Sequence, residues 1–192
     1  MSEQQRTGSG RLSLLLIAAV ACAPVIAAYA LFYLWRPTAL TNYGQLLPPT
    51  PIGALDAGRV EGKQFALAAL RGKWVFLMVD SGRCAEACRD KLYKMRQVRL
   101  TQGKDMERIE RAWLIDDDFP AAGELVGQYE GTHVVSARGS MLLEQLPAEA
   151  SVRDHIYIVD PLGNLMLRYP RGADPARMKK DVSRLLRVSR IG

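Results

Sequence analysis

The sequence predicts an α/β domain that follows a single N-terminal transmembrane helix. The first observation is a run of 24 residues without a charge, Leu12–Trp35. The second is a pair of continuously apolar segments, Trp74–Val79 and Ile156–Val159, which are typical of strands buried on both faces of a sheet. The third is apolar side chains at helical spacing between and after these segments. About 140 residues remain after the anchor and its linker, which is the size of one domain with a substantial core.

The N-terminal apolar segment is long enough to cross a membrane. As a helix it spans about 36 Å, against about 30 Å for the hydrocarbon core of a bilayer. A cleaved signal peptide has a shorter apolar core of roughly 7–15 residues. We therefore predict a tail at residues 1–11 and an uncleaved transmembrane helix at 12–35, with Tyr29, Tyr33 and Trp35 forming an interfacial aromatic belt.

The basic residues beside the anchor predict its orientation. Arg6 and Arg11 precede it, whereas Arg36 follows it and the next basic residue is Arg59. Because Lys and Arg accumulate on the cytoplasmic side, residues 36–192 are expected outside. The predicted location is a bacterial inner membrane, crossed once, with the N-terminus in the cytoplasm and the C-terminal domain in the periplasm.

The domain is predicted to extend over residues 52–192, after an extended linker at 36–51 in which four prolines oppose a regular element. The expected elements, in order, are strands at 64–67 and 74–79, a helix at 86–100, a strand at 111–115, a helix at 121–129, strands at 133–136, 156–159 and 165–169, and a helix at 175–188.

The last three elements carry clear local signals. A turn rich in Asp, Pro, Gly and Asn, residues 160–164, joins the last two strands as a hairpin. Asp174 can cap the last helix, and Pro175 suits its first turn. The apolar face of this helix is Met178, Val182, Leu185 and Leu186.

Two cysteines with three residues between them, Cys84 and Cys88, follow the first apolar strand and open a helix. A helix N-terminus favours thiolate over thiol, and Arg83 and Arg89 act in the same direction. In an oxidising compartment these two cysteines can bridge, since the remaining one, Cys22, lies in the anchor. A bridge across so short a loop stabilises a fold little. Redox or metal chemistry is therefore the better interpretation.

The order of elements is thioredoxin-like: parallel strands with crossover helices, then an antiparallel hairpin and a closing helix. In such a fold the loop that enters the 156–159 strand lies beside the cysteine turn, and His155 ends that loop. Two thiolates and one imidazole suit Cu(I), and are acceptable for Cu(II) or zinc. The alternative is a histidine with a structural role.

These residues resemble the Sco/SenC family, membrane-anchored thioredoxin-like copper proteins that assist cytochrome c oxidase assembly. The resemblance covers roughly residues 60–187. It rests on Gly72-Lys73-Trp74-Val75, the spacing of the cysteine pair, Asp154-His155 followed by Ile156-Tyr157-Ile158-Val159-Asp160-Pro161-Leu162-Gly163, and the single anchor. It implies that Cys84, Cys88 and His155 bind copper, that the cysteines form a redox dithiol, and that the partner is cytochrome c oxidase subunit II.

Three alternatives stay open. A general thiol–disulfide oxidoreductase is opposed by cysteines spaced one residue wider than C-x-x-C and by Asp154-His155 at the usual cis-proline site. A peroxidase on the same scaffold is opposed by the lack of a threonine before Cys84 that could activate a peroxide. The last alternative is a metal-free interaction module. Ala85 and Arg89 stand where the Sco/SenC family has prolines. Arg83 and Arg89 beside the site would repel a cation while favouring thiolate, which is expected of a divergent member whose redox role outlasts its copper role.

The charge of +6 is spread along the chain and indicates no nucleic acid partner. Asp116-Asp117-Asp118 is interpreted as a solvated turn. The basic residues of the last helix are interpreted as its solvated face, with contact to a membrane surface as the alternative; they are Arg177, Lys179, Lys180, Arg184 and Arg187.

Overall fold

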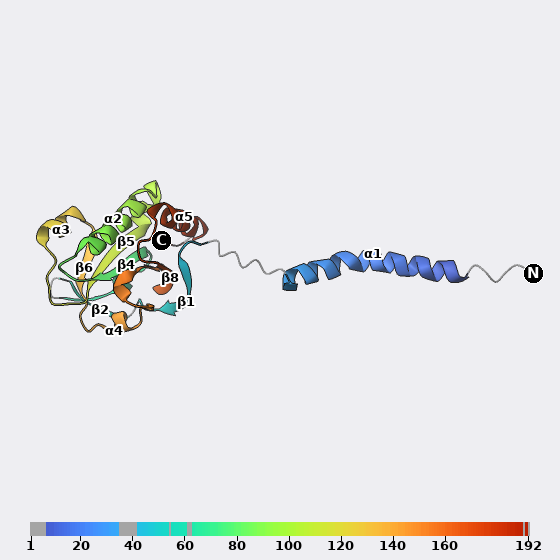
Figure 1. The fold of residues 1–192 in the computed structure, drawn as a ribbon, viewed down its shortest axis with the longest axis horizontal. Coiled ribbons are helices and arrows are strands. Elements are labelled where there is room, and N and C mark those ends of the chain that lie inside the picture. The colour runs from blue at the N-terminus through green and yellow to red at the C-terminus, as the bar shows by residue number, and fades with distance from the viewer. Residues whose placement is uncertain (1–6, 35–41, 54, 61–62, 190, 192) are drawn as a thin grey trace, which may run out of the picture. The chain divides into compact units, whose positions relative to one another are not determined.

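The computed structural model describes residues 7–34, 42–53, 55–60, 63–189 and 191. The chain forms two compact units, Met1–Thr41 and Asn42–Gly192 (Figure 1). The first contains helix α1, Thr7–Leu34. Within it Gly10–Leu34 has a mean hydropathy of 2.5, and among the described residues no other helix is long and apolar enough to cross a membrane. A single N-terminal apolar helix that can serve as an anchor is thus present, while Trp35 lies outside the described residues.

In the second unit the described residues include eight strands that form one sheet. The strands are β1 (Gln45–Pro51), β2 (Asp56–Val60), β3 (Lys63–Ala66), β4 (Trp74–Asp80), β5 (Ile109–Ile115), β6 (Thr132–Ser136), β7 (Ile156–Val159) and β8 (Asn164–Tyr169). Their order across the sheet is β1-β8-β7-β4-β5-β6-β2-β3. The central strands β4, β5 and β6 are parallel, whereas β7 and β8 run antiparallel to their neighbours. This is the predicted thioredoxin-like α/β arrangement.

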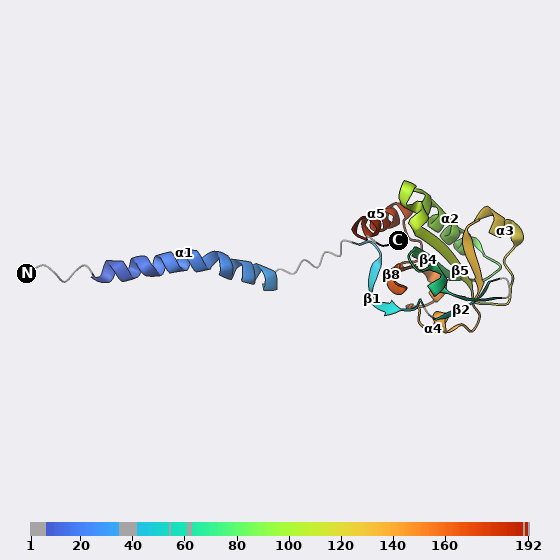
Figure 2. The same cartoon turned by 180° about the vertical axis from the view of Figure 1, so that it is seen from behind.

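The helices cover the two faces of the sheet. They are α2 (Glu86–Leu100), α3 (Gly123–Gln128), α4 (Met141–Glu144) and α5 (Pro175–Val188), with 3₁₀ turns at Leu67–Leu70, Gly103–Arg108 and Val152–Asp154. Helices α2 and α5 lie side by side on one face, and α4 lies on the other (Figures 1 and 2). Asp174 caps α5 as predicted, because its side chain accepts a hydrogen bond from the Ala176 N–H.

The side chains of each strand alternate between two apolar clusters. On β4, Phe76 and Met78 join the cluster beneath α2 and α5, whereas Leu77 and Val79 join the cluster beneath α4. We call these the α2 cluster and the α4 cluster. All of these side chains are fully buried. This explains why the strand has no polar residue before Asp80: both of its faces are covered.

The structure differs from the predicted linker at residues 36–51. Residues 35–41 lie outside the described part, but the domain begins at Asn42 and residues 45–51 form the edge strand β1, paired with β8. Its register shifts between Leu46 and Thr50, where Pro48 and Pro49 stand. An edge strand tolerates proline at such an irregularity, because no neighbour needs its missing N–H. Proline content was therefore a misleading signal.

Candidate redox site

The structure joins Cys84 and Cys88 in a disulfide, with 5.0 Å between their Cα atoms. Cys84 belongs to residues 81–85, which connect β4 to α2 and which we call the cysteine loop, and Cys88 lies in the first turn of α2. Cys84 adopts a φ of 43°, in the left-handed region that non-glycine residues rarely occupy. Its N–H donates to the Ser81 carbonyl at 3.0 Å, so a tight turn presents Cys84 to the helix.

Both cysteines are covered. Their exposed fractions are 0% for Cys84 and 1% for Cys88, and both pack in the α2 cluster. Two basic residues beside them, Arg83 and Arg89, are exposed, as is the acidic Glu86 in the first turn of α2. The Arg89 Nε donates to the Cys84 carbonyl at 3.3 Å. An external thiol can therefore reach the sulfur atoms only after a neighbouring segment moves.

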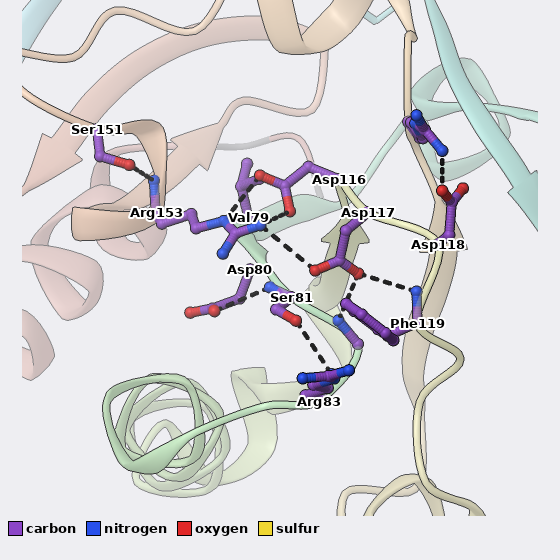
Figure 3. Close-up of polar contacts among 12 residues, drawn as sticks. Val79, Asp80, Ser81, Arg83, Asp116, Asp117, Asp118, Phe119, Ser151 and Arg153 are labelled. Atoms are coloured by element: carbon purple, nitrogen blue, oxygen red, sulfur yellow. Dashed lines mark hydrogen bonds and ion pairs between the residues drawn. The ribbon is translucent and has the colours of Figure 1, made fainter.

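The segment after β5, residues 116–121, packs against the cysteine loop, and we call it the β5 loop. The Arg83 guanidinium lies 3.6 Å from the centre of the Phe119 ring (Figure 3). A Cβ atom on Gly82 would stand 1.6 Å from the Phe119 carbonyl oxygen, so only glycine fits at this contact. Ala121 packs against the α2 cluster itself. The β5 loop is the segment best placed to control access to the disulfide.

Asp117 joins the two loops. Its Oδ1 accepts hydrogen bonds from the Gly82 N–H at 3.1 Å and the Phe119 N–H at 3.2 Å. Burial raises the pKa of Asp117, but hydrogen bonds from Ser81 and these two amides, together with the charge of Arg153, outweigh burial and lower the pKa below its ordinary value. Asp117 is therefore ionised at neutral pH.

The neighbouring aspartates also face arginines. Asp116 forms an ion pair with Arg153 at 2.7 Å, and Asp118 contacts Arg138 (Figure 3). The acidic turn is thus paired with basic side chains. Asp116 and Asp117 are half-buried there, whereas Asp118 is exposed.

We expect Asp117→Asn to weaken the acid dependence of stability. A carboxyl group whose pKa is lowered in the folded state stabilises the fold above its unfolded pKa of about 3.9, and this contribution is lost as pH falls through the folded pKa. Urea unfolding of residues 42–192 at pH 7 and pH 3 measures the effect. The wild type should lose more free energy of unfolding between these pH values than the variant, and an equal loss would contradict the role of Asp117.

A buried ion pair ties α2 to the end of β4. The Lys91 Nζ lies 2.8 Å from the Asp80 Oδ2 and donates to the Val79 carbonyl at 2.7 Å and the Arg153 carbonyl at 2.5 Å. Burial lowers the pKa of Lys91, and Asp80 opposes this shift. Sequence reasoning missed this pair. The signal was a lysine next to Leu92 on the apolar face of α2 and an acid at the end of a buried strand.

His155 is a buried residue whose described ring contacts are with β7 and β8. It directly precedes β7, and its Nδ1 donates to the Tyr169 carbonyl oxygen at 3.0 Å. Its ring stands 5.8 Å from the ring of Tyr157, which belongs to the α4 cluster, whereas the cysteines belong to the α2 cluster. The loop that enters β7 approaches the cysteine side through Arg153, whose carbonyl accepts a hydrogen bond from Lys91 of α2.

The predicted ligand set is therefore only partly assembled. The described residues contain no group of three or more His, Cys, Asp or Glu side chains arranged to hold a metal ion. Cys84 and Cys88 are together as a disulfide, and His155 borders a separate pocket of about 360 Å³ with Arg168 and Glu149. A metal site made of Cys84, Cys88 and His155 stays a prediction, and it would require reduction of the disulfide.

Comparison with known proteins places the domain in a fold group. Residues 74–189 match a family model described as "Transmembrane-like, thioredoxin-like, C-terminal domain". No curated protein matches the sequence. Solved structures do match, and each covers most of the domain at low sequence identity.

Apo Sco1 from Thermus thermophilus is 19% identical, over 78% of this chain and 98% of that chain, with a TM-score of 0.55. Copper-bound yeast Sco1 is 16% identical, over 74% of this chain and 96% of that chain, with a TM-score of 0.61. A thioredoxin-family thiol:disulfide interchange protein from Chlorobium tepidum is 19% identical, over 73% of this chain and 98% of that chain, with a TM-score of 0.53. The resemblance to Sco proteins is thus confirmed as a likeness of fold. Because the family model covers more than half of the chain, the protein belongs to the family of transmembrane-like, thioredoxin-like C-terminal domains.

Proposed function

We propose that this protein is a membrane-anchored thiol–disulfide redox protein whose Cys84 and Cys88 exchange electrons with cysteines of a partner. The observation that carries the proposal is the disulfide at the start of α2, directly after the buried strand β4. A structural role explains it less well, because a loop this short gives a bridge less entropic stabilisation than a long loop does. The N-terminus of α2, with Arg83 and Arg89 exposed beside it, favours the thiolate that such exchange requires.

In the reaction, one thiolate of the reduced pair attacks a disulfide of the partner and releases one partner thiol. The second cysteine then attacks the mixed disulfide, which restores the Cys84–Cys88 bond and releases the second partner thiol. Two electrons pass to the partner. A dithiol protein or small thiol must reduce the pair again before the next cycle.

The test uses the reduced full chain in detergent and an unstructured peptide that contains one disulfide. Each chain is expected to release two peptide thiols and to become oxidised at Cys84 and Cys88, as mass spectrometry after alkylation would report. Peptide that remains oxidised in the presence of excess reduced protein would contradict the proposal.

We expect Phe119→Ala to speed reduction of the disulfide. The variant removes the ring beneath Arg83, a contact worth about 0.5–1 kcal/mol at exposed sites, so the fraction of open β5 loop should rise roughly two- to fivefold. The rate of reduction by a phosphine, followed by alkylation, measures it. Tyr93→Ala is the matched control, because Tyr93 is an exposed aromatic residue of α2. Equal rates in both variants would exclude gating by the β5 loop.

A second candidate function is copper binding as an accessory factor for cytochrome c oxidase, with subunit II as the partner. It is favoured by the fold likeness to copper-bound yeast Sco1 and by the softness of two thiolates. The residues fit copper in part: reduction would free two sulfur ligands, while the Nδ1 of His155 is engaged with the Tyr169 carbonyl oxygen, which leaves its Nε2 as the nitrogen that could bind the metal. When bound, copper would add a redox centre or a cargo to the dithiol.

Titration of reduced residues 42–192 with Cu(I) tests this candidate. One equivalent should bind and Cys84→Ser should nearly abolish binding, whereas wild-type affinity in the Cys84→Ser/Cys88→Ser variant would exclude it. His155→Ala asks separately whether the imidazole moves to the metal, and a weaker affinity is the expected result.

We further propose that α1 places the domain in the periplasm of a bacterial inner membrane. The apolar helix and the charge bias around it support this placement. An alkaline phosphatase fusion after Gly192 is expected to be active, and a green fluorescent protein fusion exported by the same route to stay dark. The reverse pattern would place the cysteines in a reducing cytosol.

A further inference from the structure

One face of α5 is strongly basic. Its lysine and arginine side chains are exposed, and they are Arg177, Lys179, Lys180, Arg184 and Arg187. The acidic residue of this helix, Asp181, is 4% exposed, and its carboxylate accepts hydrogen bonds from the N–H groups of Tyr43 and Gly44 at 2.8–3.1 Å. The described exposed face of α5 therefore presents basic side chains, and the helix's own carboxylate is turned into the domain.

The basic side chains border a groove. It has a volume of about 510 Å³ and is lined by Ala176, Lys179, Lys180, Ser183, Arg184 and Arg187. No carboxylate is among these lining residues. Ammonium and guanidinium groups gathered around a groove attract phosphate groups.

The same helix lies against the residues at which the chain enters the domain. Besides the bonds to Asp181, the Tyr43 hydroxyl accepts a hydrogen bond from the Asp174 N–H at 3.1 Å, and the Arg177 guanidinium lies 4.1 Å from the centre of the Tyr43 ring. In the sequence, seven residues, 35–41, separate the end of α1 from Asn42. A chain of this length spans at most about 25 Å. The tether therefore keeps the entry point, and α5 with it, within reach of the bilayer that α1 would cross.

Two exposed aliphatic residues follow the basic face. Val188 ends α5 with 78% of its surface exposed, and Ile191 is 53% exposed. The Arg108 guanidinium donates to the carbonyls of Ser189 and Ile191, which holds these two residues beside the 3₁₀ turn Gly103–Arg108. Basic side chains next to exposed aliphatic ones are typical of surfaces that bind the interface of anionic membranes.

We propose that the basic face of α5 binds the anionic surface of the same bilayer that holds α1. Each lysine or arginine near such a surface adds to the free energy of membrane binding. Salt screens this attraction and so weakens binding. The short connection between α1 and the domain makes this binding intramolecular, so a modest attraction is enough to keep α5 on the membrane surface. The proposal depends on α1 crossing the membrane and is independent of the redox chemistry of the cysteines.

The experiment places the full chain in nanodiscs of phosphatidylcholine alone or with phosphatidylglycerol, and labels lysines with a trace of an acylating reagent. The readout is the labelling of Lys179 and Lys180 relative to Lys104, which is exposed outside α5. The ratio should fall severalfold in the anionic discs and recover in 1 M salt. Arg184→Gln/Arg187→Gln removes two charges. It should lower the ratio of membrane-bound to unbound domain roughly 30-fold, so Lys179 and Lys180 should again be labelled in the anionic discs.

The matched control is Arg59→Gln/Arg71→Gln, which removes the same charge from exposed residues of other elements and should leave the labelling ratio unchanged. A second variant, Ala176→Asp, adds an acidic group to the groove in the first turn of α5, where it favours the helix, and should also release the face. Equal labelling ratios in neutral and anionic discs, or an equal effect of the control variant, would overturn the proposal and leave this face to an acidic protein partner.

Discussion

Replacing both Cys84 and Cys88 by serine is expected to abolish electron exchange with a peptide disulfide while leaving the domain folded. The chain-entropy model assigns a bridge of this length about 2 kcal/mol, less than the roughly 3 kcal/mol of a 15-residue loop. The α2 cluster keeps its other apolar side chains, so the core remains. Thiol release from the peptide and urea unfolding measure the two effects.

The single variants and the third cysteine provide the controls. Either Cys84→Ser or Cys88→Ser should stop the cycle, because one cysteine can form a mixed disulfide but cannot resolve it. Cys22→Ser should exchange electrons at the wild-type rate, since Cys22 lies in α1 and forms no disulfide. Exchange that survives in the double variant would show that the chemistry lies elsewhere.

Lys91→Ala is expected to be the most destabilising substitution near the site, at about 3–5 kcal/mol of unfolding free energy. The variant leaves the Asp80 carboxylate without its buried partner, and the carbonyls of Val79 and Arg153 lose their donor. Urea unfolding of residues 42–192 measures the loss.

Lys94→Ala is the control for this substitution. Lys94 lies on the same helix and pairs with Asp90, which is 46% exposed, so its loss should cost less than about 1 kcal/mol. Similar losses in the two variants would mean that the Lys91–Asp80 pair adds nothing beyond an ordinary surface contact.

The strongest parts of the fold could be predicted because local signals and global packing agree there. The apolar run of β4, the cysteine pair at the start of α2 and the Asp174-Pro175 start of α5 each depend on neighbouring residues alone, and the structure has all three. The strand β1 could not be predicted, because an edge strand in which prolines stand at a register shift has the composition of a linker.

The composition of the site was predictable, but its geometry was only partly so. Cys84 and Cys88 are neighbours in sequence, and their proximity follows from the helix that contains Cys88. Whether the His155 imidazole reaches the two sulfur atoms depends on how the chain that enters β7 packs beside the cysteine loop, and neighbouring residues do not determine that packing. The Lys91–Asp80 pair depends on how α2 packs over β4, which no local pattern encodes.

The reduction of Cys84–Cys88 in the folded domain tests the central claim most directly. Residues 42–192 are equilibrated with glutathione buffers of graded potential under native conditions, and free thiols are alkylated and counted by mass spectrometry. The redox role predicts a single two-electron transition in which both cysteines become reduced while the circular dichroism of the fold is retained. A disulfide that stays oxidised in every native buffer, and is reduced only after the domain unfolds, would be a structural bridge and would contradict the account.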